Sequence, residues 1–164
     1  MIRIASSEYN PNAWALEIYV SGCTRHCKGC HNEELQDYSR GVPWQEWLER
    51  NRKKLTSPLV KRLWILGGDV LCQDMPSYHG MMQAFKDLGL EMWLWTGCEY
   101  ESIPESYHVW DYFYAVKAGP YELSNARSSS YRLGTSLGEL SLKLAGDNQA
   151  IYIRGNRQIP VDNL

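Results

Sequence analysis

Apolar and polar positions alternate with a period of two in several short stretches, which is typical of β-strands. In residues 13–20 the alternation places four apolar side chains on one face: Trp14, Leu16, Ile18 and Val20. Further strands are predicted at residues 62–66, 91–96, 112–117 and 150–154. Residues 118–150 contain much serine and glycine, and this pattern gives them no assignment.

Two segments between these strands have apolar residues at helical spacing. Residues 43–55 predict a helix with Pro43 as its first residue, and residues 76–90 predict a second helix that ends near Gly89. The side chains expected to face inward are Trp44, Trp47, Leu48, Leu55, Met81, Met82, Phe85 and Leu88. Strands that alternate with helices form right-handed βαβ units, so the sequence predicts an α/β domain with a mostly parallel sheet.

Three segments with candidate chemistry directly follow predicted strands. They are the cysteine-containing residues 21–32, the Gly-Gly-Asp sequence at 67–69 and the Thr-Gly-Cys sequence at 96–98. The carboxyl ends of parallel strands lie at one edge of a sheet, where ligands bind. We therefore expect these segments to converge on one site.

Composition narrows the class of protein. A chain of 164 residues with 44% hydrophobic and 22% charged residues suits one soluble domain. The net charge of −2 does not favour nucleic-acid binding. No apolar run approaches the roughly 18–20 residues of a membrane span, and residues 1–12 lack the apolar segment of a secretory signal. We expect a cytoplasmic protein that does not contact a membrane.

Cys23, Cys27 and Cys30 are the strongest chemical signal in the chain. Thiolates bind zinc or iron–sulfur clusters, and a tight cysteine group in a reducing compartment favours a metal over disulfides. With His26 or His31 the three cysteines could complete a zinc site. They could instead hold three corners of a 4Fe-4S cluster and leave one iron open. Because structural zinc sites usually draw on two separated pairs of ligands, the spacing favours iron and sulfur.

The same segment resembles a known enzyme family. The sequence CTRHCKGC (23–30) is similar to the cluster motif of radical S-adenosylmethionine (SAM) enzymes, and CHN (30–32) to that of glycyl-radical-enzyme activases. The closest resemblance is to the activating proteins of anaerobic ribonucleotide reductases. Supporting segments, in the same order as in that family, are LGGDVL (66–71), EMWLWTGCEYE (91–101), VKAGPYE (116–122) and GDNQ (146–149).

The resemblance implies a fold and a set of cofactors. Residues 1–164 would form a single radical SAM domain, a shortened, partial βα barrel with its core at about residues 13–155 and a possible insertion at 124–145. Its cofactors would be a 4Fe-4S cluster, with three cysteine ligands and one open iron, and SAM.

The resemblance also implies roles for individual residues. Cys23, Cys27 and Cys30 would bind the cluster, and Asn32 would cap the short helix that follows. The residues expected to contact SAM are Gly29, Cys30 and His31 at the adenine, Gly67 and Gly68 at the methionyl part, Asp69 at the ammonium and Thr96 at the ribose. The alternatives are an ordinary turn for the glycine pair, a helix N-cap for Asp69 and strand-end packing for Thr96.

The implied activity is reductive cleavage of SAM to a 5′-deoxyadenosyl radical, which abstracts hydrogen from a glycine of a partner enzyme. The implied partner is an anaerobic ribonucleotide reductase, with an electron donor such as a flavodoxin. This chemistry needs no side-chain acid or base, because the cofactors perform the difficult steps. Two alternatives remain open: a compact radical SAM enzyme of deazapurine synthesis that acts on a small molecule, and a zinc-binding interaction module without catalysis.

Overall fold

A computed structural model describes residues 1–125, 127–146 and 148–161. The strands are β1 (Arg3–Asn10), β2 (Ala15–Val20), β3 (Val42–Pro43), β4 (Arg62–Gly67), β5 (Glu91–Trp95), β6 (Ala115–Ala118), β7 (Ser129–Thr135), β8 (Gly138–Leu144), β9 (Ala150–Ile153) and β10 (Asn156–Arg157). The α-helices are α1 (Trp44–Leu55), α2 (Met75–Lys86) and α3 (Val109–Tyr112). Short 3-10 turns lie at Glu33–Gln36, Val70–Cys72, Tyr100–Ser102, Glu105–Tyr107 and Leu123–Asn125.

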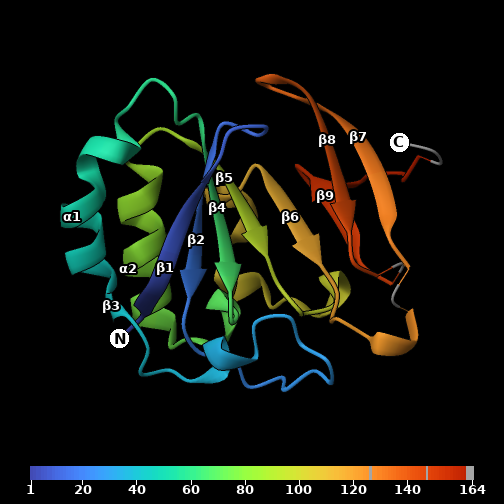
Figure 1. The fold of residues 1–164 in the computed structure, drawn as a ribbon, viewed down its shortest axis with the longest axis horizontal. Coiled ribbons are helices and arrows are strands. Elements are labelled where there is room, and N and C mark those ends of the chain that lie inside the picture. The colour runs from blue at the N-terminus through green and yellow to red at the C-terminus, as the bar shows by residue number, and fades with distance from the viewer. Residues whose placement is uncertain (126, 147, 162–164) are drawn as a thin grey trace.

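The main sheet has the strand order β10-β9-β6-β5-β4-β2-β1-β3 within the described residues (Figure 1). The four central strands, β2, β4, β5 and β6, are parallel to their neighbours in this group. The outer strands pair antiparallel: β1 with β2 and β3, and β9 with β6 and β10. The prediction of an α/β fold with parallel strands at its centre is confirmed.

The sheet is covered by helices on one face and by a β-hairpin on the other (Figure 1). Helices α1 and α2 bury Leu48, Met82 and Phe85 against apolar residues of the central strands. On the opposite face, the β7–β8 hairpin packs Tyr131 and Leu133 against the sheet. Beneath the hairpin three indole rings are in contact, with the Trp64 centroid 5.6 Å from that of Trp93 and 4.8 Å from that of Trp95.

Several predicted elements differ in detail from those observed. Trp14 does not continue the buried face of β2, because it lies before the strand with a φ of 54° and is 46% exposed. Pro43 is the N-cap of α1, and the helix begins at Trp44. The strand predicted at residues 112–117 occupies Ala115–Ala118, and the first predicted residue, Tyr112, is the last residue of α3.

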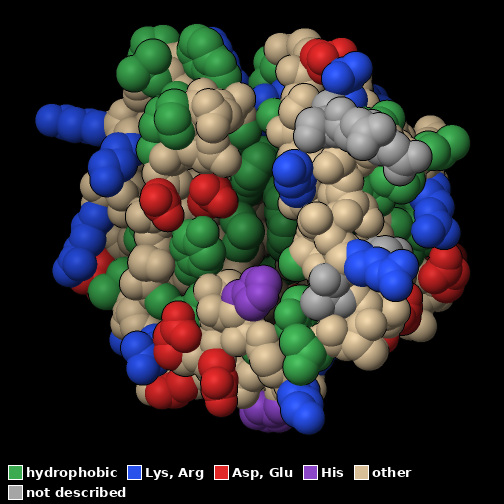
Figure 2. Space-filling model, turned by 45° about the vertical axis from the view of Figure 1, so that its right-hand side comes forward, with side chains coloured by type: hydrophobic (Ala, Val, Ile, Leu, Met, Phe, Trp, Pro, Cys, Tyr) green, Lys and Arg blue, Asp and Glu red, His purple; other side chains and the backbone are tan. Residues whose placement is uncertain are grey.

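The described part of the chain contains no helix that is both long and apolar enough to span a bilayer. Figure 2, turned so that the hairpin side comes forward, shows a hollow lined by hydrophobic side chains, with acidic side chains on its left.

Two glutamates of β1 and β2 face each other on the sheet. Glu8 and Glu17 are cross-strand partners, and like charges in this position are destabilising. Partial burial, followed by the charge of Glu8, raises the pKa of Glu17. A carboxyl whose pKa is raised on folding favours the folded state at low pH, and this stability is lost as pH rises through the folded-state pKa.

We therefore expect Glu17→Gln to increase the free energy of unfolding at pH 7 by about 0.2–1 kcal/mol. The gain should vanish below about pH 4, where the carboxyl is protonated in both states. Urea denaturation at both pH values measures this difference, with the exposed Glu105→Gln as the control. An equal gain at both pH values would contradict the electrostatic explanation.

Candidate functional site

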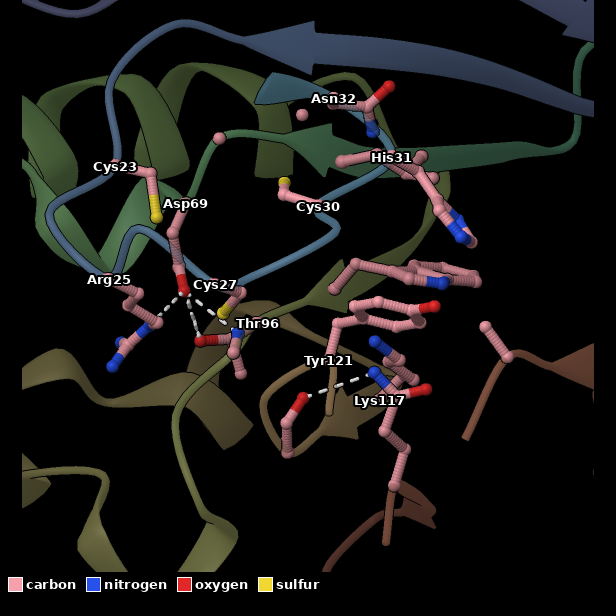
Figure 3. Close-up of a pocket in the computed structure, with 18 residues that line it drawn as sticks. Cys23, Arg25, Cys27, Cys30, His31, Asn32, Asp69, Thr96, Lys117 and Tyr121 are labelled. Atoms are coloured by element: carbon pink, nitrogen blue, oxygen red, sulfur yellow. Dashed lines mark hydrogen bonds and ion pairs between the residues drawn. The ribbon is translucent and has the colours of Figure 1, made fainter. Parts of the chain in front are cut away.

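The carboxyl ends of the parallel strands converge on one cavity of about 270 Å³. Its wall includes Cys23, Cys27 and Cys30 from the loop after β2, Gly67, Gly68 and Asp69 after β4, and Thr96 after β5 (Figure 3). The predicted convergence of the three segments is confirmed. His31 and Asn32 also line the cavity, whereas Gly29 and Cys98 are not among its lining residues.

The loop that carries the three cysteines (residues 21–32, the cysteine loop) is held by backbone hydrogen bonds at its start, and its middle part, the tip, is more open. The Gly22 N–H donates to the Leu35 carbonyl at 2.7 Å, and the Asp69 N–H donates to the Gly22 carbonyl at 2.9 Å. Within the tip, the Cys30 N–H donates to the Cys27 carbonyl at 3.1 Å. All three cysteines of the loop are free thiols of intermediate exposure, so their sulfurs are available as ligands.

Gly67 and Gly68 are the residues that bring the loop close to the end of β4. Gly67 has a φ of 111°, and a Cβ there would lie 2.4 Å from the Val20 nitrogen. A Cβ on Gly68 would lie 2.4 Å from the Gly22 carbonyl oxygen and 2.7 Å from that of Leu35. The pair is required for close packing of the backbone, and its expected contact with SAM stays a prediction.

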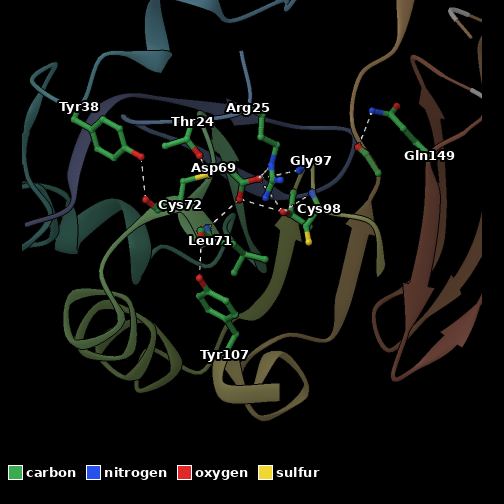
Figure 4. A network of polar contacts seen from close by, with 12 residues as sticks. Thr24, Arg25, Tyr38, Asp69, Leu71, Cys72, Gly97, Cys98, Tyr107 and Gln149 are labelled. Carbon is green, nitrogen blue, oxygen red and sulfur yellow. Dashed lines mark hydrogen bonds and ion pairs between the residues drawn. The ribbon is translucent and has the colours of Figure 1, made fainter. Parts of the chain in front are cut away.

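Asp69 is the centre of a buried polar network (Figure 4). Its Oδ2 accepts from Arg25 Nε at 3.0 Å, Thr96 Oγ1 at 2.8 Å and the Gly97 N–H at 2.9 Å, and its Oδ1 accepts from the Leu71 N–H at 3.0 Å. The last contact is the helix N-cap foreseen as an alternative. A carboxylate has about four acceptor positions. The expected contact with a ligand ammonium therefore requires that one donor be displaced.

Two other predicted residues have partners that bear on their roles. The Thr96 hydroxyl, which is buried, donates to Asp69 and accepts from the Cys98 N–H at 3.1 Å. Asn32 occupies the N-cap position of the Glu33–Gln36 turn, but its side chain makes no capping hydrogen bond. The predicted capping by the Asn32 side chain is thus wrong, because the backbone carbonyl alone accepts from Leu35.

The segments 116–122 and 146–149 support the family resemblance, but the sequence assigns no role in the site to their residues, several of which line the cavity beyond the cysteines. Lys117 at the end of β6 and Tyr121 lie on the side opposite Cys23 (Figure 3), and Gln149 also lines the cavity. The ring of Tyr121 lies 4.7 Å from that of His31, which joins the two walls. Burial lowers the pKa of Lys117 to about 8, and within the described residues its ammonium has no ion-pair partner. Asp147, part of the 146–149 segment, lies outside the described residues.

Cys72 lies beside the cysteine loop. Its sulfur accepts from the Thr24 hydroxyl at 3.5 Å, and a hydrogen bond with the Cys23 thiol lowers the pKa of Cys72 below its ordinary value. Tyr38 donates to the Cys72 carbonyl at 2.9 Å. The turn after β4 is thus in contact with the loop that carries Cys23.

The chemistry of the donor set suits an iron–sulfur cluster. Among the described residues, no three His, Cys, Asp or Glu side chains converge closely enough to hold one metal ion. The three thiolates of a cubane each bind a different iron, so they need not approach a common atom. The cysteines lie on one loop beside an open cavity, which leaves room for such a cluster.

The chain belongs to the family described as the 4Fe-4S single cluster domain, which matches residues 14–139. Fold and site together therefore define an α/β domain of the iron–sulfur class.

Curated relatives include anaerobic ribonucleoside-triphosphate reductase-activating proteins from three bacteria. The Pasteurella multocida protein is 31% identical over 88 residues, which cover 49% of this chain and 54% of that protein. The Haemophilus influenzae protein is 30% identical over 94 residues (52% and 59%), and that of Escherichia coli K12 is 28% identical over 92 residues (52% and 60%). The matched segment thus spans less than two thirds of each relative.

Proposed function

We propose that this chain is a radical SAM activase that generates a glycyl radical on an anaerobic ribonucleotide reductase. One observation carries the proposal: Cys23, Cys27 and Cys30 line the same cavity as Gly67, Gly68 and Thr96. The names of the relatives, which are activating proteins of anaerobic ribonucleoside-triphosphate reductase, support the choice of partner. In this proposal residues 1–164 form one domain, a shortened βα barrel of the radical SAM type. Residues 124–145, which contain the β7–β8 hairpin, are an insertion in it.

The proposed roles follow from the positions of the side chains. Cys23, Cys27 and Cys30 would hold three irons of the cluster, and the fourth iron would remain open to SAM. When bound, the cluster and SAM would supply an electron and the 5′-deoxyadenosyl radical that removes hydrogen from a glycine of the partner. The protein orients the ligands and limits access of water. The electron donor would be a protein such as a flavodoxin.

In this proposal the two walls of the cavity contact different parts of SAM. The backbone at Gly29, Cys30 and His31 would contact adenine, as expected from the resemblance. Lys117 faces the cavity with an unpaired ammonium within the described structure, which suits the ligand carboxylate. This contact adds a residue from β6 to those of the loops.

The test is anaerobic purification, reconstitution with iron and sulfide, and measurement of iron content and EPR spectra with and without SAM. We expect about four irons per chain and a signal of the reduced cluster that shifts with SAM. One zinc per chain, or a cluster that is indifferent to SAM, would overturn the radical mechanism. Methionine release that depends on a small molecule, and not on the reductase, would overturn the choice of partner.

We expect Lys117→Met to raise the Kd for SAM about tenfold or more, because a charge-assisted hydrogen bond is lost. Iron content should be unchanged, since Lys117 is not a proposed ligand. Calorimetric titration of the reconstituted protein measures the Kd, with Lys143→Met, an exposed lysine of the hairpin, as the control. Equal affinities for the two variants would contradict the assignment of Lys117.

A further inference from the structure

Arg25 occupies an unusual position for a surface residue. It lies between two proposed cluster ligands, Cys23 and Cys27, yet its guanidinium Nε bonds to a carboxylate that is only 1% exposed. That carboxylate, Asp69, is held in place by donors from the turn after β4 and from the loop after β5. Arg25 therefore joins the middle of the cysteine loop to the ends of two strands (Figure 4).

The packing around this ion pair is close. A Cβ on Gly97 would lie 2.6 Å from the Arg25 Cδ and 2.9 Å from its Nε. The Arg25 side chain thus lies against the backbone of Gly97. Any larger residue at position 97 would displace the Arg25 side chain. The Arg25 guanidinium also compensates the negative charge of Asp69. Without it, this buried carboxylate would have no cationic partner.

The charge of Arg25 is fixed beside the cysteines. Arg25 and Lys117 are the two cationic residues among those that line the cavity in the described structure. An arginine guanidinium is not deprotonated in proteins, and its Nε lies 3.0 Å from the Asp69 carboxylate, so this side chain remains charged. A nearby positive charge stabilises a cluster in its reduced form, which carries one more electron.

We propose that Arg25 is a positioning residue of the iron–sulfur site, which fastens the cysteine loop to Asp69 and raises the reduction potential of the cluster. The part that concerns the potential rests on the proposed function. The fastening concerns the protein alone, so it can be tested without iron.

The first test is proteolysis of the iron-free protein with a lysine-specific protease. Such an enzyme cuts after Lys28 in the loop, and the substitutions Arg25→Gln and Gly97→Ala do not change its recognition sites. Arg25→Gln should accelerate this cleavage about tenfold, because local opening no longer breaks a charged hydrogen bond. Gly97→Ala should do the same without a change in charge.

The control is Arg40→Gln, an exposed arginine outside the ion pairs of the described structure, which should leave the cleavage rate unchanged. Cleavage of Arg25→Gln at the wild-type rate would overturn the fastening role. Acceleration by Arg40→Gln as well would overturn it too, since loss of any cation would then suffice.

The second test is a redox titration of the reconstituted protein monitored by EPR. Arg25→Gln should lower the midpoint potential, Arg25→Lys should restore it, and Asp69→Asn should raise it, since that change removes the negative charge and keeps the cation. Equal potentials for wild type and Arg25→Gln would overturn the electrostatic role. Failure of the wild type to bind a cluster would instead overturn the proposed function and leave the proteolysis result standing.

Discussion

Replacement of Cys30 by alanine is expected to lower the iron content of the reconstituted protein from about four atoms per chain to below about one. A cluster held by three thiolates loses one third of its protein ligands when one of them is removed, and the neighbouring Cys72 thiol contacts Cys23. Cys30 is a free thiol in the loop tip and lies outside the buried core, so the fold should be retained. Iron analysis and the visible absorption of the anaerobic protein measure the effect.

The matched control is Cys98→Ala. Cys98 is also a partly buried free thiol near the strand ends, but it does not line the cavity. It should retain the iron content of the wild type. A protein with Cys30→Ala that still binds about four irons would show that the cluster is held elsewhere.

Arg62→Met should reduce the free energy of unfolding by about 3–5 kcal/mol, because it leaves a buried glutamate without its cation. Arg62 and Glu91 are 5% and 7% exposed, and their Nε and Oε1 atoms are 2.6 Å apart. The other guanidinium nitrogens donate to the Ala13 carbonyl at 2.7 Å and to Thr135 Oγ1 at 2.6 Å. This one side chain thus connects the main sheet with the hairpin.

Urea denaturation measures the loss. Arg50→Met, which breaks an exposed ion pair with Glu46 on α1, should cost no more than about 1 kcal/mol. The double variant Arg62→Met/Glu91→Leu should regain part of the stability, since it removes the unpaired charge. A loss from Arg62→Met as small as that from Arg50→Met would contradict the importance of the buried pair.

The sequence predicted the elements whose burial is regular. The alternation of Leu16, Ile18 and Val20 gave β2, and helical spacing gave the inward face of α2. The convergence of the cysteine loop, Gly68 and Thr96 followed from the direction of parallel strands. These features could be predicted because periodicity is a local property, and the parallel direction of the strands follows from the alternation of strands and helices along the chain.

Other elements had weaker signals or depended on distant contacts. Strand β1 buries little beyond Ile4, so its sequence lacks a clear apolar alternation. The hairpin does alternate apolar residues, at Tyr131 and Leu133 and again at Leu140 and Leu144, but serine and glycine between them obscured the pattern. The pairing of Arg25 with Asp69 joins residues 44 positions apart, which no local spacing could reveal.

The three indole rings in contact beneath the hairpin provide an intrinsic fluorescence signal that reports on the cavity. Trp95 belongs to that group and also lines the cavity, so whatever occupies the cavity lies close to a fluorescent ring. A bound chromophore that absorbs at the wavelengths of tryptophan emission will quench Trp95, and through it the neighbouring Trp64. Intrinsic fluorescence can therefore follow the loading and loss of the site in real time, without an added label.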